Sequence, residues 1–250
     1  MSDRPVLLVT GGSRGIGAAI SLTAARQGWA VVVNYATNRA AADAVVAEIE
    51  AEGGEAIVAG GDVGSQEGIK AMFAAVDEHF GRLDGLVNNA GVVDMTARVD
   101  ELSWDRVERM LRINVTGSIL CAGEAVRRMS VKHGGKGGVI VNISSVAASL
   151  GSPGQYVDYA ASKGAIDTFT SGLAKEVATE GIRVNAVRPG IINTEIHASG
   201  GLPNRARDLA HVVPMQRPGE AQEIADAVLF LLSPSASYIT GAFLDVSGGR

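Results

Sequence analysis

The chain has 250 residues, of which 46% are hydrophobic, and this length and composition are typical of one globular domain rather than of a disordered protein. Its 22 Lys and Arg against 27 Asp and Glu give a net charge of -5, which argues against nucleic-acid binding, since phosphate contacts need a concentrated basic face. The single cysteine, Cys121, excludes an internal disulfide framework and a multi-cysteine zinc site, and it indicates a reducing compartment.

Two stretches have some features of targeting or membrane segments. The apolar run 6–9 is too short for the core of a signal peptide. The uncharged stretch 137–157 is long enough to span a bilayer, but it contains Asn142, four serines and Pro153, which predict a strand followed by a loop. We therefore expect a soluble, cytoplasmic protein that does not bind membranes.

Short β-branched runs alternate with longer helical patterns along the chain. The strong sheet formers predict strands at 6–9, 31–33, 56–59, 83–87, 139–143, 184–187 and 242–246. Helical patterns lie between them, at about 15–27, 38–52, 65–80, 103–132, 157–180 and 220–232. Apolar strands separated by helices predict an α/β fold, a doubly wound (Rossmann) seven-stranded parallel sheet with helices on both faces, in a single domain 1–250. Ligands of such folds bind at the carboxyl ends of the strands.

One long irregular segment, 193–218, is rich in glycine and proline, with a short helix expected inside it. A stretch of this kind is usually a lid or a binding loop when it is ordered. We therefore expect a substrate lid here, with Arg205, Arg207 and Asp208 as polar anchors. His197 lies in the same segment, where it can touch substrate or remain a solvent-exposed loop histidine.

A glycine-rich turn, 10–17, follows the first predicted strand and opens the first helix. Gly11 permits a tight turn, Gly15 a close backbone approach to a pyrophosphate, and Gly17 a close contact between helix and strand. The helix N-terminus offers unpaired N–H groups and the positive end of its dipole to phosphates. The spacing differs from G-x-G-x-x-G, so plain turn chemistry is the alternative, but the place of the turn in the first βα unit favours a dinucleotide site. Ser13, Arg14 and Ile16 belong to the same site.

The second predicted strand lacks the acidic residue that commonly binds the ribose 2′-hydroxyl of NAD. It ends in Asn34 and leads to Arg39, and no acid lies between them. Arg14 and Arg39 can instead meet a 2′-phosphate, since a guanidinium matches phosphate geometry. We therefore expect NADP(H) to be favoured over NAD(H), with Asn34 also at its site. The alternative is that both arginines are solvated surface charges.

Four further motifs follow later strands or begin the next helix. They are Gly61-Asp62-Val63, Asn88-Asn89-Ala90-Gly91, Asn142-Ile143-Ser144-Ser145 and Tyr159-Ala160-Ala161-Ser162-Lys163. With the glycine turn, they make the whole chain resemble the short-chain dehydrogenase/reductase family, in its short single-domain branch. Within that family it is most similar to bacterial 3-oxoacyl-carrier-protein reductases and glucose dehydrogenases. The resemblance implies hydride transfer between a nicotinamide and a small-molecule ketone, aldehyde or alcohol, and a homo-oligomer, usually a tetramer.

Tyr159 and Lys163 lie four residues apart on a predicted helix, so their side chains share one face. A phenol with a pKa of about 10 is a poor acid–base group at neutral pH, and a neighbouring ammonium should lower that pKa. The resemblance gives Tyr159 the proton transfer with the substrate oxygen and lets Lys163 bind the nicotinamide ribose. A surface pair without function is the alternative.

Two more residues complete the catalytic set that the resemblance implies. Ser145 would hold the substrate oxygen as an oxyanion donor does. Ser144 remains open, because both serines follow the fifth strand and Ser145 lies one residue farther from Tyr159 than in many family members. Asn114 matches the family's asparagine, which accompanies a local helix distortion and a water-mediated relay toward the lysine. A satisfied core asparagine is the alternative, since a buried amide must have its hydrogen bonds made.

The resemblance also implies which other residues contact the cofactor. It places Asp62 and Val63 beside the adenine, and Asn88 and the motif residues Asn89, Ala90 and Gly91 beneath the cofactor. It places Pro189, Gly190, Ile192 and Thr194 at the nicotinamide.

Other features do not predict a second kind of site. The histidines lack metal-ligand spacing, so no metal is expected. The basic cluster 127–136 is either a solvated helix end or a dock for an acidic carrier protein. Two alternatives to an enzyme of this family remain. A non-catalytic dinucleotide-sensing regulatory protein has no need of the catalytic set, and a Rossmann-like methyltransferase gives the Tyr–Lys pair no role.

Overall fold

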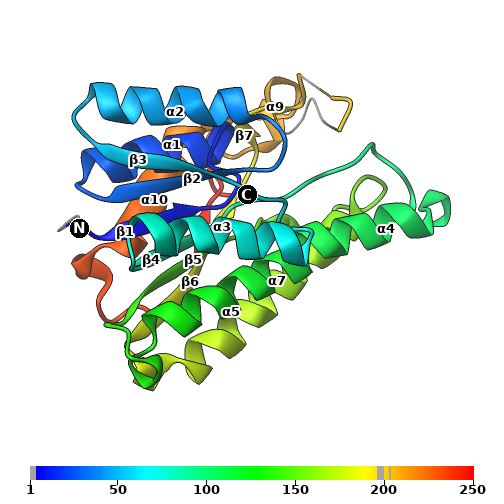
Figure 1. Ribbon diagram of the computed structural model, residues 1–250. Helices are drawn as coiled ribbons and strands as arrows, with labels where there is room; N and C mark the ends of the chain where they lie inside the picture. Colours follow the sequence, from blue (N-terminus) through cyan, green and yellow to red (C-terminus); the bar gives the residue numbers. More distant parts are fainter. Residues whose placement is uncertain (1–3, 196–199, 203) are drawn as a thin grey trace.

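The centre of the computed structural model, which describes residues 4–195, 200–202 and 204–250, is a twisted sheet (Figure 1). Seven strands form it in the order β3-β2-β1-β4-β5-β6-β9, and every neighbouring pair is parallel. The strands are β1 (Val6–Val9), β2 (Ala30–Tyr35), β3 (Glu55–Gly60), β4 (Gly85–Asn88), β5 (Gly138–Ile143), β6 (Ile182–Pro189) and β9 (Phe243–Val246). The predicted doubly wound parallel sheet is therefore confirmed, and its order reverses between β1 and β4, where such sheets bind ligands.

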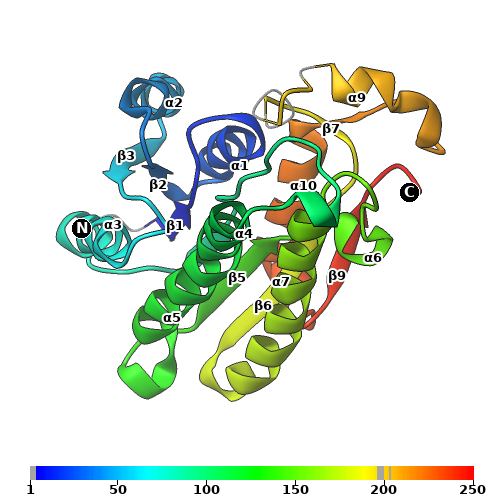
Figure 2. The same ribbon diagram turned by 90° about the vertical axis from the view of Figure 1, so that its right-hand side faces the viewer.

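Helices cover both faces of the sheet (Figure 2). On one face the core includes residues of α1 (Gly15–Arg26), α2 (Arg39–Ala51) and α10 (Ala221–Leu232). On the other face it includes residues of α3 (Gln66–His79), α5 (Ser118–Met129) and α7 (Val157–Glu176). Because helices cover both faces of the sheet, most positions of the inner strands β1, β2, β4 and β5 are apolar, whereas β6 alternates apolar residues with polar ones such as Asn185.

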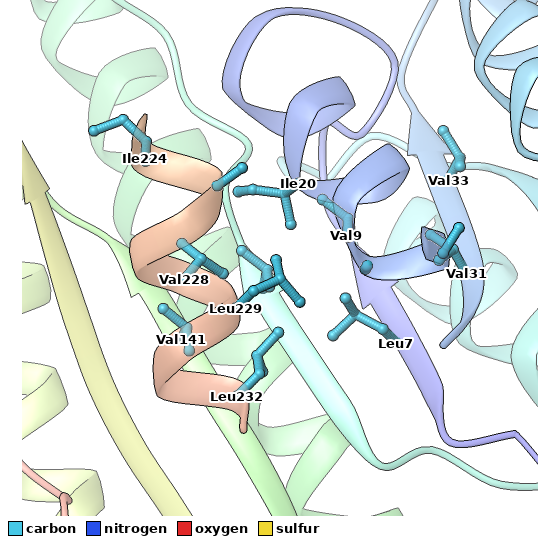
Figure 3. Packing of buried hydrophobic residues seen from close by; sticks show 14 of the residues in the cluster. Leu7, Val9, Ile20, Val31, Val33, Val141, Ile224, Val228, Leu229 and Leu232 are labelled. Atoms are coloured by element: carbon cyan, nitrogen blue, oxygen red, sulfur yellow. The ribbon is translucent and has the colours of Figure 1, made fainter. Parts of the chain in front are cut away.

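Successive side chains of β1 point to opposite faces of the sheet. Leu7 and Val9 pack against Ile20 of α1 and Leu229 of α10, as Figure 3 shows, whereas Leu8 belongs to the core on the opposite face. These side chains are all 2% exposed or less, and burying each one contributes about 1.5–3 kcal/mol relative to leaving it in water. The packing fixes the start of α1 directly beyond the end of β1, where the glycine turn lies.

Two predicted helices differ from the observed ones. The pattern over 103–132 is divided into α4 (Trp104–Leu111), a π-helix (Arg112–Gly117) and α5. The helix predicted over 157–180 ends at Glu176. The stretch after β5, predicted as a loop, contains the short helix α6 (Ala147–Leu150).

The predicted starts of α2 and α3 agree with the structure to within one residue. Asn38 and Ser65 are the N-caps of these helices, and their side chains accept hydrogen bonds from the first turns.

The irregular segment contains the expected short helix, α9 (Arg205–Asp208). Its two ends are joined, because β7 (Ile192–Asn193) pairs in parallel with β8 (Gly219–Glu220), an element that the sequence did not predict. This pairing holds both ends of the segment next to the carboxyl end of β6. Over the ranges given above, the chain forms no helix with the length and apolar character needed to cross a membrane.

Candidate active site

A cleft of about 510 Å³ opens at the carboxyl ends of the central strands, a volume suited to a small organic ligand. Its wall is built from the ends of β5 and β6, helix α6, the start of α7 and helix α9, which Figure 2 shows gathered at one end of the sheet. Three of the four predicted catalytic residues line it: Ser145, Tyr159 and Lys163. The cleft is therefore the candidate active site.

Tyr159 lies in the first turn of α7 and is partly buried. Burial raises the pKa of Tyr159 to about 12, and a hydrogen bond with Ser145 opposes this rise only in part. The Nζ atom of Lys163 lies 5.6 Å from the centre of the Tyr159 ring. The pKa of the phenol is thus raised, not lowered as expected, because loss of solvent disfavours the phenolate more than the bond with Ser145 favours it.

Lys163 lies one turn further along α7 and is only 5% exposed. Its Nζ atom donates a 2.8 Å hydrogen bond to the carbonyl oxygen of Ile143, the last residue of β5. The pKa of Lys163 is lowered to about 8, because burial disfavours the ammonium. The negative charge of Asp167 favours the ammonium and offsets part of this lowering. The ammonium is thus held at the strand end and is mostly charged at neutral pH.

The two candidate serines differ in what they bond. The Oγ atom of Ser144 donates to Oδ1 of Asp167 at 2.6 Å, so this hydroxyl is part of a polar network behind the cleft. The Oγ atom of Ser145 accepts a 3.1 Å bond from the backbone N–H of Ala147, in the first turn of α6, and Ser145 acts on the Tyr159 hydroxyl by lowering its pKa. Ser145 is therefore the serine that the structure places beside the tyrosine.

Asn114 lies in the π-helix and is 1% exposed. Its Oδ1 accepts from the backbone N–H of Val92 at 2.8 Å, and its Nδ2 donates to the carbonyl of Val92 at 3.0 Å and to Oγ of Ser162 at 3.1 Å. The expected helix distortion is present, and the amide is satisfied, as the alternative interpretation required. Gly91 faces both residues, since a Cβ there would lie 3.4 Å from Oδ1 of Asn114 and 3.7 Å from Nζ of Lys163.

The glycine turn has the geometry of an anion site. Gly11 and Gly15 have φ angles of +61° and +52°, a region that favours glycine. A Cβ at Gly17 would lie 2.2 Å from the carbonyl oxygen of Gly11, so the close contact that Gly17 permits is with the turn itself rather than with a strand. Helix α1 starts without a side-chain cap and without an acidic residue in its first turn. Its N–H groups and dipole are thus available to a phosphate, and the turn fits a dinucleotide.

Three comparisons with known proteins agree with this geometry. A family model described as Enoyl-(Acyl carrier protein) reductase matches residues 11–250. The oxidoreductase YgfF of Escherichia coli K12, described as uncharacterised, is 54% identical over 245 residues, covering 98% of this chain and 99% of its own. A 3-oxoacyl-[acyl-carrier-protein] reductase of Synechocystis sp. PCC 6803 is 42% identical over 247 residues, covering 98% of this chain and 96% of its own.

A solved structure of a short chain dehydrogenase from Burkholderia cenocepacia J2315 in complex with NADP superposes with a TM-score of 0.89. It is 36% identical and covers 98% of this chain and 97% of its own. The chain belongs to the short-chain dehydrogenase/reductase family. It is accordingly an NAD(P)-dependent oxidoreductase acting on CH–OH groups or carbonyls, as the sequence predicted.

The residues predicted to hold the family's cofactor form two groups. Those that line the cleft are Ile16, Asn89, Gly91, Tyr159, Lys163, Pro189, Gly190, Ile192 and Thr194. The others lie at or beyond the ends of β1 to β4: Gly11, Ser13, Arg14, Gly15, Gly17, Asn34, Arg39, Asp62, Val63 and Ala90. The two groups are continuous, because a Cβ at Gly15 would lie 3.6 Å from the Thr194 side chain.

Asn34 and Asn89 are occupied in holding the glycine turn. Oδ1 of Asn34 accepts from the N–H of Gly11 at 3.0 Å, and its Nδ2 donates to the carbonyls of Ala59 and Gly61. Nδ2 of Asn89 donates to the carbonyl of Gly11 at 3.1 Å. Both side chains thus shape the turn from below, and their amide groups are engaged with backbone rather than turned toward a ligand.

The two arginines expected at the 2′-phosphate differ in their surroundings. Arg14 is exposed at the start of α1 and forms no ion pair with any carboxylate in the described part of the chain. Arg39 is exposed too, but its Nε lies 3.4 Å from Oδ2 of Asp43 on the next turn of α2. Such a surface pair contributes about 0–1 kcal/mol, so it restrains Arg39 only weakly.

The sequence analysis missed a charged network next to the lysine. Asp167 lies one turn beyond Lys163 on α7, and its Oδ2 accepts bonds from Nε and Nη2 of Arg188 at 3.1 and 2.8 Å. The guanidinium of Arg188 also stacks on the ring of Phe243 at 4.2 Å. The spacing of four residues between Lys163 and Asp167 was visible in the sequence and indicates a shared helix face, by the same rule that paired Tyr159 with Lys163.

Other cleft residues were predicted in part. Of the three polar anchors expected in the irregular segment, Arg205 lines the cleft, whereas Arg207 and Asp208 are exposed and do not. Helix α6 and Arg250 line it without having been predicted. His197 lies outside the described residues.

Proposed function

We propose that the protein is an NADP(H)-dependent carbonyl reductase that also oxidises the corresponding alcohol. Bound NADPH would supply the hydride to the carbonyl carbon, and NADP⁺ would accept it in the reverse direction. The observation that carries the proposal is the convergence of Ser145, Tyr159 and Lys163 on one cleft, where the Nζ atom of Lys163 lies 5.6 Å from the centre of the Tyr159 ring. Two hydroxyl donors at one point are suited to a substrate oxygen that gains negative charge.

Each residue of the set has a role that follows from its contacts. A pKa of about 12 keeps Tyr159 protonated at neutral pH, so it is ready to give its proton to the developing alkoxide. The charged Lys163 then stabilises the phenolate that remains. Ser145 accepts from the backbone of Ala147, and its own hydrogen, which favours the Tyr159 phenolate when no substrate is bound, would be donated to the substrate oxygen. Asn114 acts through others, by holding the backbone of Val92, which follows Gly91 beside the lysine, and the hydroxyl of Ser162, which precedes the lysine on α7.

The decisive experiment is turnover of a mixed carbonyl and alcohol panel by the wild type and by Tyr159→Phe. The panel includes a crotonyl thioester, because the matching family model is named for enoyl reduction. We expect carbonyl reduction to fall by at least about 100-fold in the variant, since a positioned acid contributes about 10²–10⁴-fold. Ser145→Ala should also lose activity, and Ser144→Ala should retain most of it. Near-wild-type turnover by Tyr159→Phe would refute the mechanism, and NADPH binding without any turnover would favour the dinucleotide-sensing alternative.

The preference for NADP(H) is supported by Arg14, by the missing acid after β2 and by the NADP in the Burkholderia relative. Arg14→Gln should lower kcat/KM for NADPH by about tenfold or more, because a charge-assisted hydrogen bond contributes about 1.5–3 kcal/mol, and should leave NADH unaffected. Arg39→Gln, assayed in the same way, measures how much Arg39 contributes to kcat/KM for NADPH. Equal use of NADH and NADPH by the wild type would contradict the proposal.

We further propose a single domain, with 193–218 as its substrate lid, that works in the cytoplasm as a homo-oligomer. The buried, unpaired Cys121 is compatible with a reducing compartment. Helices α4 and α5 expose Leu111, Ile119 and Leu120, apolar side chains that a subunit contact would cover. Sedimentation equilibrium tests the assembly, and a purely monomeric protein at micromolar concentration would contradict it.

A further inference from the structure

The wall of the cleft is positively charged in a protein whose net charge is -5. Three cationic side chains line it, Lys163, Arg205 and Arg250, and none of the described residues that form the wall is Asp or Glu. Lys163 is committed to the carbonyl of Ile143 and lies in the field of Asp167. The two arginines have no such partner: over the described ranges, neither forms an ion pair with a carboxylate.

Arg205 is held in place by neutral groups. Its Nη2 donates a 2.7 Å hydrogen bond to Oε1 of Gln155, and its guanidinium lies 5.0 Å from the centre of the Tyr156 ring. Tyr156 is 6% exposed, and both neighbours belong to the cleft wall just before the first turn of α7. A guanidinium has five N–H donors, so most of them remain for a ligand. The side chain is therefore oriented in advance and still able to bind.

Arg250 adds a second positive charge near the first. Burial lowers the pKa of Arg250, and the charge of Arg205 lowers it further, which places the two guanidinium groups within each other's field. Figure 2 shows the end of the chain and α9 at the same end of the sheet as α6. No Asp or Glu side chain of the described residues lines the cleft beside these two guanidinium groups, so an anion bound there would relieve their repulsion.

We propose that the substrate carries an anionic group, a carboxylate or a phosphate, that Arg205 binds while the carbonyl lies at Tyr159 and Ser145. Arg250 adds to the attraction. This inference rests on the proposed carbonyl reductase activity and narrows its substrate class. Planar carboxylate and phosphate groups both accept two parallel bonds from a guanidinium, so the two sources share one chemistry and must be separated by experiment.

The test compares matched substrates that differ in charge. One pair is levulinate and its methyl ester, and the other is dihydroxyacetone phosphate and dihydroxyacetone. Each is assayed with NADPH against the wild type, Arg205→Gln, Arg205→Lys and Arg207→Gln. Arg207 is the matched control, because it lies on the same short helix, is exposed and does not line the cleft.

We expect the charged member of one pair to have the higher kcat/KM, and the pair that shows this identifies the anion as carboxylate or phosphate. Arg205→Gln should lower kcat/KM for that substrate by about tenfold or more, mainly through KM, and leave the neutral member unchanged. Arg205→Lys should retain part of the effect, and Arg207→Gln should match the wild type. Circular dichroism and thermal melting confirm that each variant is folded.

The possible failures are distinguishable. Reduction of the neutral members with no advantage for either anion, or equal losses for both members in Arg205→Gln, overturns the anion site and leaves the reductase proposal intact. If no member is reduced, calorimetric titration of levulinate and dihydroxyacetone phosphate into the protein–NADP⁺ complex decides. Binding that Arg205→Gln removes supports the anion site without the reductase, and no binding to the wild type overturns it.

Discussion

Replacing Lys163 by methionine should abolish activity and make the folded protein more stable at neutral pH. The pKa of this lysine falls from its ordinary value of 10.5 to about 8 on folding, because its ammonium is buried. One pKa unit corresponds to about 1.4 kcal/mol, so holding the charge inside the fold costs about 3 kcal/mol. Methionine removes this cost but also removes the bond to Ile143, which contributes about 1–2 kcal/mol. The net gain should be about 1–2 kcal/mol.

The pH dependence separates this effect from simple repacking. Between pH 8 and 10.5 the unfolded chain keeps the lysine proton and the folded chain releases it, so the unfolded state binds more protons and the free energy of unfolding rises with pH. Above pH 10 the raised pKa of Tyr159 acts in the opposite direction, because the unfolded tyrosine loses its proton first. Measurements should therefore stay between pH 7.5 and about 9.5.

The assay is urea unfolding followed by circular dichroism, with Lys175→Met as the control. Lys175 lies on the same helix and is exposed, so its replacement should give a curve parallel to the wild type. Over the range from pH 8 to 9.5 the wild type should gain about 2 kcal/mol relative to Lys163→Met. Parallel curves for the wild type and Lys163→Met would show that the buried lysine keeps an ordinary pKa, and the reasoning would fail.

Two further replacements test the surroundings of the site. Asp167→Asn removes a carboxylate that raises the pKa of the active-site lysine, so the pH profile of kcat/KM should move to lower pH. The free energy of unfolding of the same variant, measured in urea, should fall by about 1–3 kcal/mol. This is less than the usual loss for a broken buried ion pair, because the Arg188 side chain is 20% exposed. An unchanged pH profile of kcat/KM would refute the electrostatic role of Asp167. Gly17→Ala would place a Cβ 2.2 Å from a backbone oxygen and should weaken NADPH binding, measured by fluorescence titration, by about tenfold or more. Gly172→Ala, where the same atom meets open space, is its control.

The sequence predicted elements wherever the deciding contacts are local. The apolar strand runs and the helical patterns that begin at 38 and 65 depend on neighbouring residues, and the strands and helix starts they predict are observed, with Asn38 and Ser65 as N-caps. The interruption of the long helix at the π-helix could not be derived from periodicity. The π-helix is accompanied by two contacts between residues far apart in the sequence. Asn114 bonds to Val92, 22 positions earlier, and Gly117 lies close to the carbonyl of Val63, 54 positions earlier.

The same division applies to the site. The spacing of Tyr159 and Lys163 placed both on one helix face, and the structure does bring them to one cleft. The direction of the tyrosine's pKa was predicted wrongly, because the number of atoms that exclude water from a side chain depends on the tertiary packing and is not encoded in spacing. The choice between Ser144 and Ser145 likewise needed the position of Asp167, on a different element.

The proposed catalytic residues and the proposed substrate-binding arginine lie on different parts of the fold. Ser145, Tyr159 and Lys163 are positioned by β5 and α7, elements packed into the core of the sheet, so their relative geometry is fixed by the fold. Arg205 lies on α9, in a segment whose two ends are joined by the two-residue strands β7 and β8, outside the main sheet. A segment attached in this way can change length and charge without disturbing the sheet. The motifs therefore predict the family and its type of reaction, whereas the substrate class proposed above rests on Arg205, which belongs to no motif and whose place in the cleft appears only in the folded structure.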